Sequence, residues 1–298
     1  MIIPHLWFDE EAKEAAKFYA SAFPKAKVTS VSRIYGTPSG DCDIVGFEIY
    51  GQPFMAISAG PLFKVNPSIS FIVHFDQLLV KDARKQLDKL WARLSQGGQA
   101  LMPLDRYPFS EHYGWVQDRF GVSWQLMLTD PRDDRRPFIV PALLFVGPNV
   151  GRAEEAATFY RWVFKKSKKG FTARYPKGQG PDMEGTVMFM DFQLDGTWVG
   201  AMDSAHHHKF TFNEAVSLMI PCKTQKEIDH YWETLSAVPE AEQCGWLKDK
   251  FGVSWQVTPA DMGRMLKGSK AQVKRVTEAF LPMKKFDLNR LKAAYLGK

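Results

Sequence analysis

Residues 114–125 are GWVQDRFGVSWQ, and residues 245–256 are GWLKDKFGVSWQ. Both tryptophans, the aspartate, the Phe-Gly pair and the closing Ser-Trp-Gln recur in the same order and at the same spacing. Chance does not repeat such rare residues over a dozen consecutive positions. The chain therefore contains two copies of one domain, and each copy ends in a tight turn that leads into a strand.

A second repeat lies near the start of each copy. EAAKFY at 14–19 matches EAATFY at 155–160, and Asn66 and Ser70 match Asn213 and Ser217. The offset between matches varies, as it does when insertions fall in loops. Between the copies lies a charged run bracketed by prolines, which is typical of a linker. We expect two domains at 1–130 and 138–260, a linker at 131–137, and a C-terminal helical tail at 261–298.

Composition narrows the class of protein. Hydrophobic residues make up 45% of the chain, enough to fill two ordinary cores, and no apolar run is long enough to span a bilayer. The N-terminus lacks the basic start and apolar core of a signal peptide. Three scattered cysteines form no C-x-x-C pair, so a reduced, cytoplasmic protein is expected. The net charge of +6 is modest, and we expect no membrane or nucleic-acid partner. The one lysine cluster, at 165–169, is typical of a solvated helix end.

Hydrophobic periodicity predicts the same plan in each half. A strand at Ile2–Phe8 and a helix at Asp9–Phe23 are followed by three strands, with a hairpin turn at Gly51-Gln52. A second round starts at Ile69–Phe75, continues through a helix at Val80–Leu94, and ends near the repeated motif. The second half repeats the plan from Phe138 to Pro259, with Asp195-Gly196 as its hairpin turn. The predicted fold is α+β with antiparallel hairpins, in which strand–helix–three strands occurs twice in each domain.

The tail differs in character. Asp261–Phe280 is predicted to be one amphipathic helix, Pro282 to end it, and Asp287 to cap a last helix through Leu291 and Tyr295. We expect the tail to pack on its own chain. A homodimer or a partner interface is the alternative.

This plan resembles the tandem βαβββ modules of the glyoxalase/bleomycin-resistance/dioxygenase superfamily, also called vicinal oxygen chelate. The motif Gly-Trp-x-x-Asp-x-Phe-Gly-Val-Ser-Trp-Gln, with Asn-x-x-x-Ser before an apolar strand, is similar to that of the PhnB-like branch. Members of that branch are often labelled 3-demethylubiquinone-9 3-methyltransferase. The resemblance covers both domains and implies the fold. It does not imply one function, because one fold hosts many chemistries.

The methyltransferase label finds no support in the residues. A cofactor such as S-adenosylmethionine commonly needs a glycine-rich turn between a strand and a helix, and no G-x-G-x-G follows a predicted strand. The nearest clusters, Gly178-Gln179-Gly180 and Gly97-Gly98, lie in predicted loops. We expect no cofactor, and methyl transfer is the weakest of the alternatives.

The resemblance also implies where a divalent metal would bind. The superfamily's enzymes place His or Gln on the first strand of each module and Glu on the last strand. Carried over, those positions hold residues that make poor metal ligands, namely Ile3, Ser70, Val140, Ser217, Gln125 and Gln256. Asp203 is the only nearby carboxylate, and the triplet His206-His207-His208 occupies a variable loop. We therefore expect no metal.

Strand alternation predicts which side chains share a face with these positions. His5 and Trp7 follow Ile3, and Ile72 and His74 follow Ser70. We expect domain one to gather a ligand-binding set around one cavity, namely His5, Trp7, Ser70, His74 and Gln125. In domain two, Ser217 and Gln256 lie on a matching but apolar face. His5 and His74 are either hydrogen-bonded core histidines or a general base and a ligand-binding group.

Other repeated residues have structural and functional interpretations. We expect Asp118 and Asp249 to cap backbone amides in their turns, and Trp124 and Trp255 to pack under the helices. Glu111 precedes the Gly-Trp strand, as Glu242 does in the second half. Glu111 is a further catalytic candidate, because it could reach the mouth of the cavity.

Two functions of different class follow. The first is metal-independent binding of an aromatic or amphipathic small molecule. The second is a metal-independent enzyme that acts on a small organic substrate through His5 or His74. The residues leave open whether the cups form within or between domains.

Overall fold

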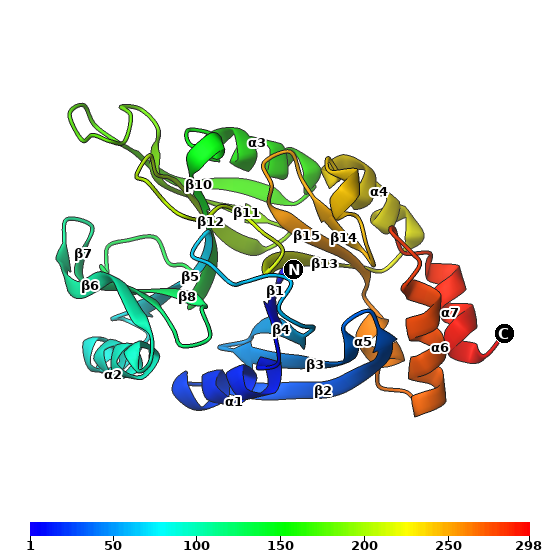
Figure 1. Ribbon diagram of the computed structural model, residues 1–298. Helices are drawn as coiled ribbons and strands as arrows, with labels where there is room; N and C mark the ends of the chain where they lie inside the picture. The colour runs from blue at the N-terminus through cyan, green and yellow to red at the C-terminus, as the bar shows by residue number, and fades with distance from the viewer.

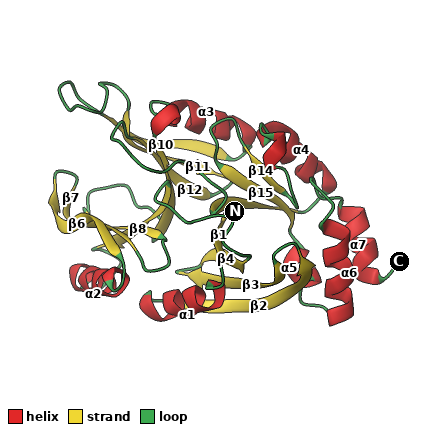
Figure 2. Cartoon of the chain, viewed as in Figure 1, coloured by secondary structure: helices red, strands yellow, loops and turns green.

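The computed structural model describes all residues from 1 to 298 and folds them into two mixed β-sheets with helices on their outer faces (Figures 1 and 2). The first half supplies eight strands and two helices: β1 (Ile3–Phe8), α1 (Ala12–Ala22), β2 (Ala26–Thr37), β3 (Gly40–Ile49), β4 (Gln52–Ser58), β5 (Ile69–Asp76), α2 (Ala83–Ser95), β6 (Gln99–Tyr107), β7 (Ser110–Gln117) and β8 (Ser123–Thr129). This half confirms the predicted plan of strand, helix and three strands, done twice.

The second half repeats the plan with one difference. Its elements are β9 (Ile139–Phe145), η1 (Gly147–Asn149), α3 (Ala153–Val163), β10 (Ser167–Arg174), β11 (Val187–Leu194), β12 (Thr197–Asp203), β13 (Val216–Cys222), α4 (Gln225–Leu235), η2 (Pro239–Ala241), β14 (Trp246–Lys248) and β15 (Ser254–Pro259). Only two strands follow α4, so the predicted third strand is wrong. The short 3-10 turn η2 lies in its place, and its first residue, Pro239, has no N–H to give to a strand ladder.

Each sheet is built from both halves of the chain. Sheet A has the order β14-β15-β13-β1-β4-β3-β2, and sheet B has the order β10-β11-β12-β9-β5-β8-β7-β6. Antiparallel pairs join the halves: His5 of β1 lies opposite Ser217 of β13, and Ser70 of β5 lies opposite Ala142 of β9. The sheets therefore form between the two halves, which resolves the alternative that the sequence left open.

The repeated motif fixes the helices to the outer faces. Trp124 and Trp255 are fully buried, and their rings contact Tyr19 and Tyr160 of α1 and α3 edge-on. The predicted packing under the helices is confirmed. The hairpin turn after β3 lies one residue earlier than expected, because Tyr50 and Gly51 have the positive φ values of 51° and 79° that a two-residue hairpin turn needs.

Asp118 and Asp249 cap their turns as predicted, and each also binds two side chains. Asp118 accepts hydrogen bonds from the N–H groups of Phe120 and Val122, the hydroxyl of Tyr19 and the indole N–H of Trp124. Asp249 has the same four kinds of partner. Burial raises the pKa of each carboxyl to about 6, while these hydrogen bonds to the charged form oppose the rise.

The tail forms three helices rather than the two expected, α5 (Met262–Met265), α6 (Lys270–Phe280) and α7 (Leu288–Leu296). The single helix predicted over 261–280 is wrong because Ser269 starts a new helix, with a capping box to Gln272. The predicted cap of the last helix is confirmed, since the Asp287 side chain accepts a hydrogen bond from the N–H of Arg290.

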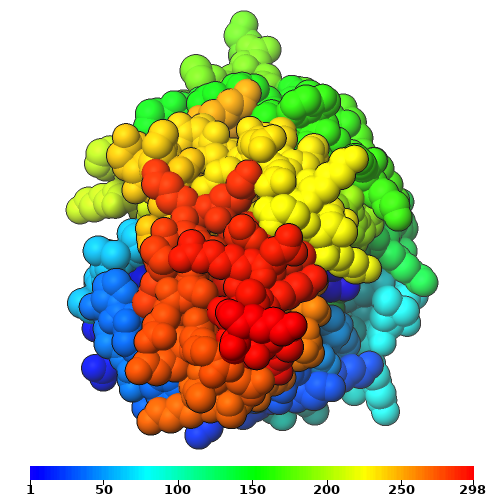
Figure 3. Space-filling view, turned by 90° about the vertical axis from the view of Figure 1, so that its right-hand side faces the viewer, coloured from blue at the N-terminus to red at the C-terminus, as the bar shows by residue number.

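The tail packs against both halves, as Figure 3 shows for its orange and red segments between the blue and yellow ones. Helix α6 contacts β2 of the first half, and the N–H of Cys244 donates to the carbonyl of Met283 at 2.7 Å. Ile34 and Cys42, which pair across β2 and β3, are buried at this end of sheet A. None of the helices is both long and apolar enough to cross a membrane.

Candidate functional site

We call the face of each sheet that is turned away from α1–α4 its inner face. Four of the predicted site residues lie at the centre of the inner face of sheet A. His5 and Trp7 come from β1, Ser217 from β13 and Gln256 from β15. The Gln256 side-chain amide donates to the Ser217 hydroxyl at 2.9 Å. These residues therefore meet across the junction of the two halves, where β1 pairs with β13.

His5 lies in an aromatic corner and has no polar partner. Its side chain is 6% exposed, and Nδ1 is buried without a hydrogen-bond partner. The ring is edge-on to Trp246 at 5.3 Å between centroids, and Trp246 is edge-on to Trp7 at 5.9 Å. Burial lowers the pKa of His5 to about 3, so the imidazole is neutral at physiological pH. Sequence reasoning missed Trp246, although it belongs to the repeated motif.

Around this corner the inner face of sheet A is apolar and only partly covered. Trp7 is held by a hydrogen bond from its indole N–H to the carbonyl of Gly60 at 2.7 Å, and Phe63 packs edge-on against it. Five further side chains on this face are half-buried and apolar, namely Ile3, Ile44, Met55, Ile57 and Met219. The arrangement presents a neutral imidazole between two indoles and aliphatic side chains.

The inner face of sheet B carries the other predicted residues. The Gln125 amide donates to the Ser70 hydroxyl at 2.8 Å and accepts from the Tyr113 hydroxyl at 2.7 Å. His74 is 7% exposed, and its Nδ1 is also buried without a partner. Burial, followed by the positive charge of Arg136, lowers the pKa of His74 to about 4, and Asp76 opposes this. His74 is therefore neutral at physiological pH as well.

The two histidines do not share a site. His5 lies in sheet A and His74 in sheet B, so the expectation that one cavity of domain one holds both imidazoles is wrong. The local pattern gave the correct face for each residue. It could not show that β1 and β5 belong to different sheets, because that depends on which strand of the other half pairs with each.

A buried ion pair on the inner face of sheet B was not predicted. Asp191 of β11 is 4% exposed and accepts from the guanidinium of Arg136 and from the N–H of Phe171. The guanidinium lies over the ring of Trp198, 4.0 Å from its centroid. The available signal was a single aspartate in the middle of an apolar strand, because a buried carboxylate needs a partner.

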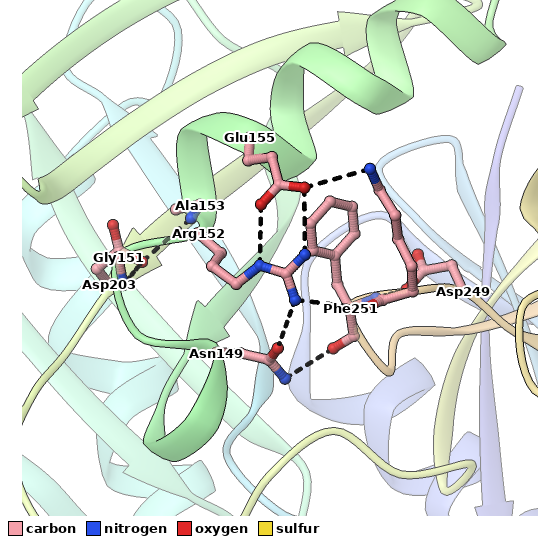
Figure 4. Close-up of polar contacts among 9 residues, drawn as sticks. Asn149, Gly151, Arg152, Ala153, Glu155, Asp203, Asp249 and Phe251 are labelled. Carbon is pink, nitrogen blue, oxygen red and sulfur yellow. Dashed lines mark hydrogen bonds and ion pairs between the residues drawn. The ribbon is translucent and has the colours of Figure 1, made fainter.

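Asp203, the only carboxylate considered as a metal ligand, has a structural role (Figure 4). It accepts hydrogen bonds from the N–H groups of Gly151 and Ala153 at 2.8 and 3.1 Å and from the N–H of Val187 at 3.0 Å. Its side chain therefore holds the start of α3 against β11. The nearby Arg152 pairs with Glu155 at 2.9 Å.

The remaining candidates lie away from the inner faces or are already paired. Glu111 is exposed and forms an ion pair with Arg106 at 2.9 Å. Glu242 accepts from the Ser236 hydroxyl and the Lys284 ammonium. In the histidine triplet, His206 lies 3.5 Å from Asp182, and His208 hydrogen-bonds Ser204.

The donor set does not fit the metal that the fold family implies. The positions that would supply ligands hold aliphatic side chains, hydroxyls or amides, and each amide is already hydrogen-bonded to the serine beside it. Nowhere do three or more His, Cys, Asp or Glu side chains gather closely enough to hold a metal ion. The two glycine clusters that the sequence pointed to do not form a strand-to-helix turn for S-adenosylmethionine: Gly97-Gly98 connects α2 to β6, and Gly178 and Gly180 lie between β10 and β11.

Comparisons with known proteins show which family the sequence matches and which solved structures it resembles. The model of the 3-demethylubiquinone-9 3-methyltransferase family matches residues 1–127 and again residues 137–258. A PhnB protein from Bacillus cereus is 34% identical over 43% of this chain and 98% of its own, with a TM-score of 0.38. Glyoxalase I from Zea mays is 12% identical over 89% of this chain and 95% of its own, with a TM-score of 0.55. No curated protein matches the sequence.

The similarity to glyoxalase I is one of fold alone. The family match covers most of the chain. The chain therefore belongs to the 3-demethylubiquinone-9 3-methyltransferase family, in its PhnB-like form, with two tandem copies of the family's domain on a glyoxalase-type fold.

Proposed function

We propose that the chain binds an aromatic or amphipathic small molecule on the inner face of sheet A, without a metal ion. The observation that carries this proposal is the buried His5, which has no hydrogen-bond partner and lies beside two half-buried indoles. A buried polar atom left without a partner costs about 1–3 kcal/mol. A ligand that hydrogen-bonds the imidazole and packs on Trp7 and Trp246 would remove that cost.

The comparison of equivalent positions supports sheet A rather than sheet B. Half-buried Ile3, Trp7 and Met219 in sheet A correspond to Val140, Leu144 and Ile72 in sheet B, which are at most 4% exposed. Sheet A therefore leaves apolar surface open where sheet B covers it, and apolar surface with a few polar groups is typical of ligand sites.

A fluorescence titration with a neutral aromatic probe, N-phenyl-1-naphthylamine, tests the proposal. Trp246→Ala is expected to weaken probe binding at least tenfold, because it removes one indole wall beside His5. Trp115→Ala is the matched control, since Trp115 has the same motif position in sheet B, and it should change binding less than twofold. Equal weakening by both variants, or no saturable binding, rejects the site.

Native mass spectrometry of untagged protein tests the same proposal without a chosen probe. We expect a mass increase equal to one small organic molecule and unchanged by a chelator. A stoichiometric divalent metal instead would reject the metal-independent part of the proposal.

An enzyme that uses His5 or His74 as a general base is less well supported. An efficient base has a pKa near the working pH, whereas burial lowers the pKa values to about 3 and about 4. The double variant His5→Gln/His74→Gln separates the two functions: probe binding should persist, because glutamine still offers a hydrogen bond, and a histidine-dependent turnover would be lost.

A further inference from the structure

The motif tryptophan that starts β14 in sheet A lacks a hydrogen bond that its counterpart in sheet B makes. In sheet B, the indole N–H of Trp115 donates to the Ser123 hydroxyl at 2.6 Å. The equivalent residues of sheet A are Trp246 and Ser254. The Ser254 hydroxyl is buried and has no hydrogen-bond partner, so the Trp246 indole does not bond it.

The strands themselves do not cause this difference. The β7–β8 and β14–β15 pairs have the same register, since Trp115 lies opposite Gln125 and Trp246 lies opposite Gln256. Each motif serine comes two residues before its glutamine, and so lies on the same face of the sheet. Ser254 therefore has the same position relative to Trp246 as the bonded serine has relative to Trp115. The difference lies in the direction of the side chain.

The Trp246 ring is turned toward aromatic neighbours that sheet B lacks. It lies edge-on to His5 and Trp7, with 5.3 and 5.9 Å between ring centroids. The counterpart of His5 in sheet B is Ala142, because each lies opposite the serine of its sheet's Gln–Ser pair. In sheet A, contact with two rings therefore competes with a hydrogen bond to Ser254.

The backbone just before Trp246 is held in place by the tail. The N–H groups of Cys244 and Gly245 each donate to a carbonyl of the tail at 2.7 Å. A Cβ on Gly245 would clash with the Phe286 ring, so this contact also fixes the backbone. A change in the direction of the indole is therefore a rotation of the side chain and not a movement of the strand.

The observed direction of the ring closes the site proposed on sheet A. His5 is 6% exposed and its Nδ1 is buried, while Trp246 is half-buried and in edge-on contact with the imidazole. A ligand reaches Nδ1 only after a neighbouring side chain moves. A turn of Trp246 toward Ser254 uncovers the imidazole and gives the buried hydroxyl a donor.

We propose that Trp246 opens the site on sheet A by turning its indole from His5 to Ser254, and that Ser254 is the positioning residue of the open form. This inference rests on the proposed function, because it concerns how that ligand enters. The closed form gains two aromatic contacts and leaves two buried polar atoms without partners. The open form gains the hydrogen bond seen in sheet B, and the ligand replaces the indole beside the imidazole.

Fluorescence titration with N-phenyl-1-naphthylamine tests the role of Ser254. Ser254→Ala removes the acceptor of the open form and is expected to weaken probe binding about fivefold, which is what one hydrogen bond contributes. Ser123→Ala is the matched control in sheet B and should change binding less than twofold. Unchanged binding in Ser254→Ala, or an equal loss in both variants, would overturn the inference.

A double-mutant cycle separates positioning of the indole from direct contact with the ligand. Trp246→Phe keeps an aromatic ring and removes the indole N–H. Adding Ser254→Ala to that variant should therefore change binding less than twofold, because the serine acts through the N–H that is already gone. A further fivefold loss would show that the hydroxyl contacts the probe itself, and the positioning role would be wrong.

Thermal unfolding tests the closed form without any ligand. Ser254→Ala removes a hydroxyl that has no partner, so the melting temperature should not fall. Ser123→Ala breaks the bond from Trp115 and should lower the melting temperature by a few degrees. An equal fall in both would show that Trp246 already bonds Ser254 in the free chain, which contradicts the inference.

Failure of the proposed function gives a different result. The unmodified chain would then show no saturable probe binding at all. Saturable binding that Ser254→Ala does not weaken rejects only the turning of Trp246 and leaves the binding surface on sheet A in place.

Discussion

The inner faces of sheets A and B share one hydrogen-bonded Gln–Ser pair and differ in the side chains around it. At the centre of each, a glutamine amide donates to a serine hydroxyl, Gln256 to Ser217 and Gln125 to Ser70, at 2.9 and 2.8 Å. Around that pair, sheet A exposes indole and aliphatic surface. Sheet B fills the equivalent positions and adds Tyr113, which bonds Gln125. The two faces thus carry the same central pair, but the apolar side chains around it are half-buried in sheet A and buried in sheet B.

One equivalent position changes the charge of the face as well. Gly46 lies opposite Met55 in sheet A, and Asp191 lies opposite Gly200 in sheet B. The aspartate requires Arg136, and Arg136 brings the linker onto sheet B. At this position, therefore, the Asp191–Arg136 ion pair holds the linker against sheet B.

The largest expected effect tests whether the buried aspartate of the repeated motif contributes equally to stability in both halves. Asp118→Ala and Asp249→Ala each leave a tyrosine hydroxyl, an indole N–H and two backbone N–H groups without an acceptor. Each change should cost about 4 kcal/mol or more of unfolding free energy, measured by urea denaturation. The exposed Asp261→Ala is the control. A cost in one half less than half of that in the other would contradict the equivalence.

The next effect tests the feature that is unique to sheet B. Arg136→Ala leaves the buried Asp191 carboxylate without its partner and should cost about 3 kcal/mol of unfolding free energy. Arg135→Ala removes the neighbouring, exposed arginine and should stay within about 0.5 kcal/mol. Similar small costs for both in urea denaturation would show that the ion pair contributes little.

The pH dependence of stability compares the two buried imidazoles. Their pKa values of about 3 and about 4 in the folded chain lie below the usual 6.5. As pH falls below 6.5, each histidine is protonated in the unfolded chain but stays neutral in the folded chain. Each histidine therefore lowers the free energy of unfolding by about 2 kcal/mol at pH 5. His5→Gln and His74→Gln should each reduce the loss between pH 7 and pH 5 by that amount. An unchanged pH slope in unfolding curves would show that the imidazole is not desolvated.

The smallest effect concerns the serine–glutamine pairs themselves. Gln256→Leu leaves one hydroxyl, that of Ser217, without its donor and should cost about 1 kcal/mol. Gln125→Leu leaves both the Ser70 and the Tyr113 hydroxyl without their partner and should cost about 2 kcal/mol. Thermal unfolding of the two variants measures the difference, and equal melting points would show that Tyr113 adds nothing to the network.

Local patterns in the sequence predicted most of the fold. The repeat defined the units, and strand alternation placed His5, Trp7, Ser70 and Gln125 on the correct faces, because side-chain direction follows from the backbone alone. The break between α5 and α6 was missed, since Ser269 and Gln272 form a capping box inside an otherwise continuous amphipathic pattern.

The candidate site was harder to predict, because it depends on contacts between distant segments. The pairing of β1 with β13 decides that His5 meets Trp246 rather than His74, and no local signal encodes that choice. Likewise, Asp118 was correctly predicted to cap a turn, but its bond to Tyr19 comes from a helix about a hundred residues away in the chain.

The pairing of β1 with β13 and of β5 with β9 also bears on how such a chain can evolve. Two separate copies of one half would have to find each other in solution, and every substitution would appear twice. A covalent connection raises the effective concentration of the halves, so their association no longer depends on the amount of protein. It also frees the two faces from symmetry: a mutation such as the one that separates Gly46 from Asp191 alters one face and leaves the other intact. Fusion thus allows two copies of one surface to diverge independently.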